Sequence, residues 1–282
     1  MEILRTVAEL RQWSRAARST ACGGTVGLVP TMGALHAGHV SLIRAARASC
    51  SQVAVSIFVN PTQFGPNEDY ARYPRTFDAD YALAKAEEAS VIFAPSVEEF
   101  YPAGASTFVE VEGLGNRLDG ALRPGHFRGV ATVVAKLLIA AEPDHAFFGQ
   151  KDAAQVAVIR RMVADLRMAT EIVVCPIVRE PDGLALSSRN VFLSPAERAQ
   201  SLTISRAICQ VEALASVGER RSGTLIEAAH KTIAVESAIR IDYIELVDWA
   251  TLEPRETAAP GSLFAVAAWV GATRLIDNAI LE

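Results

Sequence analysis

Short runs of apolar residues alternate with helix-like stretches through the first two thirds of this 282-residue chain. The strand-like runs, rich in β-branched and aromatic side chains, lie at residues 25–30, 53–59, 90–94, 144–148 and 171–178. Apolar residues recur at helical spacing over residues 38–50, 77–89, 129–141 and 151–166. Continuous apolar strands that alternate with helices are typical of a parallel sheet covered on both faces. The pattern therefore predicts an α/β fold built on a doubly wound parallel sheet.

The pattern changes after residue 178. Two helical stretches follow at 195–217 and 222–237, and Ser194, Pro195 and Glu197 form the signature of a helix N-terminus. Strand-like runs then lie at residues 242–247, 263–270 and 273–277. Helices followed by a small antiparallel sheet indicate a separate, smaller C-terminal α+β domain. We place the domain boundary at residue 178.

Composition and charge exclude several classes of protein. Apolar residues make up 50% of the chain and charged residues 21%, which is ordinary for a globular protein. The longest apolar run near the C-terminus, residues 263–270, is far shorter than the ~20 residues of a membrane-spanning helix. The net charge is −5 and no long basic run is present. We therefore expect neither a membrane nor a nucleic acid as a partner.

Two further features favour the cytoplasm. Glu2 and Glu9 stand where a secretory signal would have a basic start and an apolar block. The four cysteines contain no CxxC pair, so the sequence indicates neither a zinc cluster nor a redox motif. Apolar neighbours predict that Cys175 and Cys209 are buried thiols.

The segment after the first predicted strand, His36-Ala37-Gly38-His39, carries the strongest functional signal. Ligands of open parallel sheets bind at the carboxyl ends of the strands. Gly38 permits a close backbone approach, and the start of a helix offers N–H groups and the positive end of its dipole. Two imidazoles there can donate to the phosphate oxygens of a triphosphate. Unrelated histidines or a metal site are the alternatives, although no nearby Cys, Asp or Glu completes a metal site.

Two later strand ends carry groups of the same kind. Lys151 follows Gly149 at a strand-to-helix junction, where its ammonium could hold phosphate oxygens, and Asp152 could cap the helix or accept from ribose hydroxyls. Ser187, Ser188 and Arg189 combine two hydroxyls with a guanidinium, which suits β- and γ-phosphates. A solvent-facing lysine and an ordinary polar turn are the alternatives.

Gln63 and Gln155 indicate a different kind of ligand. Their neutral amides both donate and accept, which suits the hydroxyl groups of a small polar substrate, although isolated glutamines are more often surface residues. The sequence contains no P-loop signature, no Gly-x-Gly-x-x-Gly after a strand and no Gly-x-Ser-x-Gly elbow. These absences disfavour a P-loop ATPase, a Rossmann dehydrogenase and an α/β-hydrolase.

The longer motifs around these residues resemble a known family. His-x-Gly-His after a first strand is similar to the nucleotidyltransferase superfamily that includes class I aminoacyl-tRNA synthetases. Six blocks in register, from about residue 3 to residue 280, resemble the pantoate–β-alanine ligases: VPTMGALHAGH, SIFVNPTQF, YPRT, RPGHFRGV, FFGQKDAAQ and DGLALSSRN. The order and spacing of six blocks are far more specific than one motif alone.

The resemblance implies an ATP-dependent ligation in two steps. The pantoate carboxylate attacks the α-phosphate of ATP to give pantoyl adenylate and pyrophosphate, and the amine of β-alanine then displaces AMP. Magnesium (Mg²⁺) accompanies the triphosphate, so no metal ligand is expected from the protein. Members are typically cytoplasmic homodimers. Residues 1–178 would form a Rossmann-like domain that binds nucleotide and pantoate, and residues 179–282 an α+β lid domain that folds over the nucleotide.

The family pattern also implies roles for individual residues. Gln63 would contact pantoate and β-alanine, Gln155 would contact pantoate, and His39 would be a proton donor with His36 beside it. Asn60, Tyr73 and Arg123 match the family without a fixed role. Lys151 and Arg189 would join the two histidines in catalysis. The ATP-binding residues would be Met32, Gly33, Ala34, Leu35, His36, Ala37, Gly38, His39, Gly149, Gln150, Lys151, Asp152, Val178 through its backbone, Leu186, Ser187, Ser188 and Arg189.

Two alternatives to this function remain open. One is a nucleotidyltransferase of the same superfamily that acts on another acid or on a phosphate ester, although the two glutamines favour a hydroxy acid. The other is a catalytically silent nucleotide-binding protein, which the presence of every motif cation disfavours. The acidic net charge and the lack of a large basic module disfavour a tRNA-charging enzyme.

Overall fold

The computed structural model describes residues 1–19, 23–65 and 70–282. The chain divides into two compact units. Unit 1 comprises Met1–Gly149 and Val158–Cys175, and unit 2 comprises Gln150–Ala157 and Pro176–Glu282. The domain boundary at residue 178 stays a prediction.

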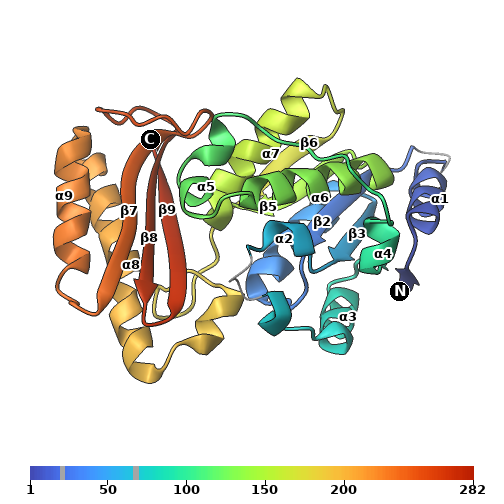
Figure 1. The fold of residues 1–282 in the computed structure, drawn as a ribbon, viewed down its shortest axis with the longest axis horizontal. Helices are drawn as coiled ribbons and strands as arrows, with labels where there is room; N and C mark the ends of the chain where they lie inside the picture. The colour runs from blue at the N-terminus through green and yellow to red at the C-terminus, as the bar shows by residue number, and fades with distance from the viewer. Residues whose placement is uncertain (20–22, 66–69) are drawn as a thin grey trace. The chain divides into compact units, whose positions relative to one another are not determined.

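Unit 1 contains a six-stranded parallel sheet (Figure 1). Its strands lie in the order β1 (Glu2–Leu4), β4 (Val91–Phe93), β3 (Gln52–Ile57), β2 (Val26–Thr31), β5 (His145–Gly149) and β6 (Glu171–Cys175). The chain runs outward from β2 through β3 to β4 and then returns to β5 on the other side of β2. The carboxyl ends of β2 and β5 therefore flank the point where the strand order reverses, which is where such sheets bind ligands.

The helices of unit 1 cover both faces of this sheet. One face packs Leu42, Ile43 and Ala46 of α2 and Ala84 of α3 against apolar residues of the strands. The alternate strand residues, such as Leu28, are buried as well, so the other face is also covered; there α1 and α6 contact β2. This arrangement confirms the predicted doubly wound α/β fold. The helix bounds are α1 (Val7–Arg18), α2 (Ala37–Ser49), α3 (Phe77–Ala86), α4 (Val97–Phe100), α5 (Asp119–Leu122), α6 (His126–Ala141) and α7 (Ala153–Asp165), of which residues 153–157 of α7 belong to unit 2.

Some predicted bounds of unit 1 shift for identifiable reasons. The strand β6 ends at Cys175 rather than at residue 178, because the next residue, Pro176, has no N–H to donate to the sheet. The helix α3 ends at Ala86 rather than at residue 89, shortly before Glu88 takes a φ of +57°. Two elements near the N-terminus were not predicted: β1, which has only three residues, and α1, which Thr6 and Glu9 begin with a capping box. Residues 66–69 of the polar loop at 60–75 lie outside the described residues.

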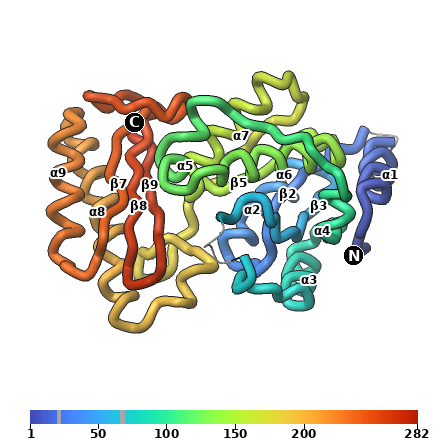
Figure 2. The backbone as a smooth tube through the Cα atoms, in the orientation of Figure 1, coloured from blue at the N-terminus to red at the C-terminus, as the bar shows by residue number. Residues whose placement is uncertain are grey.

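Unit 2 contains a three-stranded antiparallel sheet, β7 (Ile239–Asp248), β8 (Ser262–Val270) and β9 (Thr273–Leu281), with the helices α8 (Pro195–Ser216) and α9 (Ser222–Ile233). Figure 2 follows the chain from the two helices into the three strands. Apolar residues of both helices and all three strands form one core, which confirms the predicted α+β composition. The capping box of Ser194 and Glu197, with Pro195 between them, is present at the start of α8 as predicted.

The cysteines differ in part from the prediction. Cys175 is buried, but Cys209 is exposed, because it lies on α8 between Ile208 and Val211 of the core and faces the other way. Cys50 is also buried, and burial raises the pKa of its thiol to about 11. Among the helices that the structure describes, none combines the length and the apolar character needed to cross a membrane.

Candidate active site

The segment after β2 is bent by two residues in the left-handed region. Gly33 has a φ of +82° and Ala34 a φ of +51°. The buried carboxylate of Asp80, on α3, accepts hydrogen bonds from the backbone N–H groups of Ala34 (2.9 Å) and Leu35 (2.8 Å). A Cβ at position 33 would lie 3.0 Å from Asp80 Oδ2, so glycine fits there best. Asp80 thus holds the turn that leads the chain into α2.

His36 and His39 form a reciprocal pair at the start of α2. Nδ1 of His36 accepts the N–H of Gly38 at 3.1 Å, and Nδ1 of His39 accepts the N–H of His36 at 3.3 Å. The two ring centroids lie 4.2 Å apart. Because each Nδ1 accepts a hydrogen bond, each neutral ring carries its proton on Nε2. The pair caps the helix through Nδ1 and has its N–H donors on the other nitrogen of each ring.

Gln63 is held at both ends of its side-chain amide. Its Oε1 accepts from Nδ2 of Asn60 (3.0 Å), and its Nε2 lies 3.1 Å from Sδ of Met32. Asn60 is buried and also donates to the carbonyl of Gly129 at 3.1 Å. Since Oε1 must face the Asn60 donor, the NH₂ end of the Gln63 amide faces Met32. The structure therefore brings Gln63 to the first predicted nucleotide segment, as the neighbouring ends of β2 and β3 predict.

A second set of contacts reaches Gln63 from the start of α6. Nη1 of Arg123 lies 3.0 Å from Nε2 of His126, and Nδ1 of His126 lies 2.8 Å from the carbonyl oxygen of Gln63. A guanidinium only donates, so Nε2 accepts and Nδ1 carries the proton given to the carbonyl. The helix approaches this loop closely at Gly129, where a Cβ would lie 2.3 Å from the carbonyl oxygen of Thr62.

The resemblance gave no role to Asn60, Tyr73 and Arg123. All three lie around residues 60–64, the loop that carries Gln63. Asn60 orients the Gln63 side chain, and Arg123 acts on its backbone through a histidine. Tyr73 is buried, and its ring packs against Phe64 with the ring centroids 6.0 Å apart.

The second predicted nucleotide segment begins where β5 ends, at Gly149. The chain makes one 3₁₀ turn, η4 (Gln150–Asp152), and α7 begins only at Ala153 rather than at residue 151 as predicted. Nζ of Lys151 lies 3.1 Å from Oδ1 of Asp152, and its side chain is 19% exposed. Gln155, half-buried, lies on the first turn of α7.

The third predicted segment continues from a tight hairpin in unit 2. The N–H of Leu186 donates to the carbonyl of Val178 (2.9 Å), so the residue proposed to contact adenine and the first residue of this segment are paired. Ser187 then caps a 3₁₀ helix, η5 (Ser188–Phe192), through its Oγ, which accepts the N–H of Arg189 at 3.2 Å. A hydroxyl that accepts one hydrogen bond can still donate its own proton.

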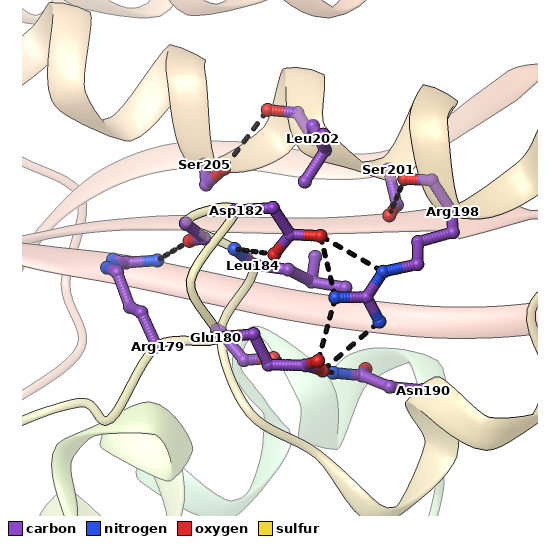
Figure 3. Close-up of polar contacts among 11 residues, drawn as sticks. Arg179, Glu180, Asp182, Leu184, Asn190, Arg198, Ser201, Leu202 and Ser205 are labelled. Carbon is purple, nitrogen blue, oxygen red and sulfur yellow. Dashed lines mark hydrogen bonds and ion pairs between the residues drawn. The ribbon is translucent and has the colours of Figure 1, made fainter.

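Arg198 of α8 holds this hairpin (Figure 3). Its Nη2 lies 2.7 Å from Glu180 Oε2 and 2.6 Å from Asp182 Oδ2, and Asn190 donates to Glu180 Oε1 at 2.7 Å. Hydrogen bonds from Arg198 lower the pKa of Glu180. Burial alone would raise the pKa of Asp182, but the contacts with Arg198 and the backbone outweigh it and lower that pKa as well.

The predicted site residues are thus divided between the two units. Unit 1 contains the 32–39 segment, Gln63 and Gly149, whereas unit 2 contains residues 150–152, Gln155, Val178 and the 186–189 segment. Within unit 1, Gln63 and the 32–39 segment lie together. That both sets bind one nucleotide stays a prediction.

Two residues that hold these segments were not identified in the sequence. Asp80 lies early in a helix, where acidic residues are common, so nothing distinguishes it from a residue that favours the helix dipole. Asn278 donates to the carbonyls of Gln150 and Lys151. Its signal was available: Asp277 and Asn278 interrupt an apolar stretch, and consecutive strand residues point to opposite faces.

Comparison with known proteins identifies the family. The family described as Pantoate-beta-alanine ligase matches residues 2–280. The pantothenate synthetase of Acidobacterium capsulatum is 58% identical over 282 residues, covering 99% of this chain and 94% of that protein. The pantothenate synthetase of Koribacter versatilis is 54% identical over 282 residues, covering 100% of this chain and 96% of that protein. The chain belongs to the pantoate–β-alanine ligase family.

Solved structures of the pantoate–β-alanine ligase family share the fold. Pantothenate synthetase from Thermus thermophilus has a TM-score of 0.93 and 45% identity, with 99% of each chain covered. Pantoate-β-alanine ligase from Francisella tularensis, complexed with β-γ ATP and β-alanine, has a TM-score of 0.79 and 34% identity, with 99% of this chain and 97% of that chain covered. The predicted function is confirmed: the chain is an ATP-dependent ligase that joins pantoate to β-alanine through a pantoyl adenylate.

Proposed function

We propose that this ligase binds one ATP through three segments of the chain and activates pantoate beside the first segment. The segments are 32–39, 149–152 and 186–189, with the backbone of Val178 against adenine and Asp152 near the ribose. His36, His39, Lys151 and Arg189 would donate to phosphate oxygens, where negative charge builds as the α–β bond breaks. Among these four residues, His39 would be the one that donates a proton in the reaction.

The observation that carries this proposal is the reciprocal capping of His36 and His39. Backbone N–H groups occupy both Nδ1 atoms, which fixes the neutral tautomer with Nε2–H in each ring. The two rings therefore supply paired, oriented donors at the N-terminus of α2. Donors that are fixed before the reaction need no reorganisation as charge develops, which is the condition for strong electrostatic catalysis.

The pantoate pocket is proposed around Gln63 and Gln155, with Gln63 also contacting β-alanine. The Asn60 contact fixes the Gln63 amide so that its NH₂ group faces Met32. Neutral amides position a hydroxy acid without clamping its carboxylate, whereas a bidentate arginine would reduce its nucleophilicity. Holding the carboxylate in line with the α-phosphate could supply about 7–11 kcal/mol through proximity.

Magnesium is proposed to enter with the triphosphate and to neutralise part of its charge. Among the residues that the structure describes, no three His, Cys, Asp or Glu side chains gather into a metal-binding group. The ligands of the ion are proposed to be phosphate oxygens and water, as the resemblance to the family implies. The protein's own contribution is the set of donors from His36, His39, Lys151 and Arg189.

Three further parts of the proposal rest on resemblance to the family. The ligase is proposed to be a cytoplasmic homodimer, and the C-terminal α+β domain is proposed to fold over the nucleotide. Such a cover would exclude water from the adenylate, which is prone to hydrolysis.

The test is incubation of the protein with ATP, Mg²⁺ and pantoate, with and without β-alanine. Without β-alanine we expect pyrophosphate in amounts near one per active site, because the adenylate stays bound. With β-alanine we expect repeated turnover to AMP and pantothenate. Faster ATP–pyrophosphate exchange with another acid from a panel would overturn the assignment of pantoate, and the lack of any turnover would indicate a silent nucleotide-binding protein.

A further inference from the structure

The strand β9 carries two consecutive polar residues, Asp277 and Asn278, that are only 3% and 4% exposed. Consecutive side chains in a strand point to opposite faces, so a strand with one solvated face would expose one of the two. Burial of polar groups is unfavourable unless they find hydrogen-bond partners. The location of those partners therefore identifies what the pair holds in place.

Among the described residues, every side-chain hydrogen bond of Asn278 goes to the second nucleotide segment. Nδ2 donates to the carbonyl of Gln150 (3.0 Å) and to the carbonyl of Lys151 (2.9 Å). Oδ1 accepts from Nε2 of Gln150 at 3.1 Å. These three bonds fix the backbone from which the Lys151 side chain extends. All three residues belong to unit 2.

Asp277 holds the hairpin that leads into the third segment. Its carboxylate accepts from Nη1 (2.6 Å) and Nη2 (3.0 Å) of Arg179, and Arg179 donates to the carbonyl of Gly183 at 3.2 Å (Figure 3 shows Arg179 on this hairpin). The same carboxylate accepts the backbone N–H of Asn278 at 2.8 Å, so the Asp277 side chain also contacts the backbone of the next residue.

We propose that Asp277 and Asn278 are positioning residues that set the second and third nucleotide segments at a fixed spacing. The inference rests on the proposed binding of ATP by those segments. β9 suits this task because it pairs with β8 along its whole length, from Thr273 to Leu281. Both segments are thereby attached to neighbouring residues of one rigid strand. A phosphate-binding group displaced by about 1 Å can lower a rate about 10²-fold.

The test compares Asn278→Ala in the wild-type chain and in a Lys151→Met chain, by pantoate-dependent ATP–pyrophosphate exchange. In the wild-type chain we expect kcat/KM for ATP to fall about 10- to 100-fold. In the Lys151→Met chain we expect little further loss, because the side chain that Asn278 positions is already gone. An equal loss in both chains is the result expected of a merely structural residue and would overturn the proposal.

Asp242→Asn is the matched control. Asp242 is a carboxylate on β7 of the same sheet that accepts from Trp269 (2.9 Å) and Arg274 (2.8 Å), so its loss also breaks a partly buried arginine pair. We expect this variant to lose stability without a change in kcat/KM for ATP. A loss equal to that of Asn278→Ala would show that any damage to this sheet impairs ATP use.

Arg179→Lys is a second test, which can be used if Asn278→Ala does not fold. It keeps the charge beside Asp277 but loses the two-pronged contact, and we expect kcat/KM for ATP to fall about 10-fold. No loss in this variant would contradict the proposal. If Lys151→Met catalyses ATP–pyrophosphate exchange at the wild-type rate, the proposed ATP site itself is overturned. If Lys151→Met is slow but Asn278→Ala exchanges at the wild-type rate, only the positioning role is overturned.

Discussion

His36 and His39 cap one helix through the same ring atom. Each Nδ1 accepts a backbone N–H, from Gly38 at 3.1 Å and from His36 at 3.3 Å. The capping bond and the proposed phosphate donor therefore lie on different nitrogens of the same side chain. Because the two functions use different atoms, substitutions can remove one and leave the other.

His36→Asn is expected to separate the two functions. Asparagine is a favourable N-cap residue, so the helix keeps its cap while the Nε2–H donor is lost. We expect adenylate formation to fall about 10²–10³-fold, the range for the loss of one preorganised donor. Thermal unfolding should change little in this variant, whereas His36→Ala should also lose about 1 kcal/mol of capping stability. Wild-type exchange in folded His36→Asn would remove His36 from the phosphate site.

Gln63→Ala is expected to weaken pantoate binding more than ATP binding, because the proposed contact of its amide is with the hydroxy acid. Isothermal titration with each ligand separately measures the difference. Asn60→Ala should act in the same direction but less strongly, because it leaves the Gln63 amide in place and removes the bonds that orient it and that join Asn60 to Gly129 and Thr62. We expect about a 10-fold loss of pantoate affinity in Gln63→Ala, equivalent to one or two hydrogen bonds. Equal losses for the two ligands would place Gln63 outside the acid pocket.

Substitutions of Asp80 are expected to disturb the turn at residues 33–35. Asp80→Ala leaves two N–H groups without their acceptor, which costs about 1–3 kcal/mol for each buried group. Asp80→Asn keeps one acceptor oxygen, so its loss of stability should be smaller. Urea unfolding gives the stabilities, and the KM for ATP should rise in the same order. An unchanged KM in both variants would show that the turn does not affect nucleotide binding.

The Arg198 cluster predicts a dependence of stability on acid pH. Arg198 helps to lower the pKa values of Glu180 and Asp182 below their ordinary values of 4.5 and 3.8. A carboxyl whose pKa is lowered on folding adds stability above its ordinary pKa and loses it as the pH falls through its folded value. The stability advantage of the wild-type chain over Arg198→Met should therefore shrink as the pH falls from about 5 to about 3. A constant advantage over this range, measured by urea unfolding, would contradict the role of the ion pairs.

Much of the fold follows from patterns in the sequence. The apolar runs at β2, β3 and β5 predict the parallel sheet because each is buried on both faces, whereas the apolar run of β6, at the edge of the sheet, is only partly buried. The end of β9 was missed because Asp277 and Asn278 look like the end of a strand, although hydrogen bonds permit their burial and the strand continues to Leu281. A local pattern can mark such a polar residue, but it cannot reveal partners that lie far away in the sequence.

The candidate site was predictable to a similar degree. His36 and Gln63 follow predicted strands, so the sheet topology alone predicts where they lie. What supports them was not predictable: the interrupted apolar stretch marks Asn278 as unusual, but its partners lie more than a hundred positions earlier, and those of Asp80 lie more than forty positions earlier. The chemical groups of the site are thus visible in the sequence, and the contacts that orient them are visible only in the fold.

The most direct test of the proposed site is pantoate-dependent ATP–pyrophosphate exchange in Lys151→Met, without β-alanine. Methionine keeps much of the length and apolar volume of the side chain but removes the ammonium, and thermal unfolding checks that the fold is intact. We predict exchange about 10²–10³-fold slower than in the wild-type chain, at an unchanged unfolding temperature. Exchange at the wild-type rate in the folded variant would contradict the assignment of Lys151 to the phosphates of ATP.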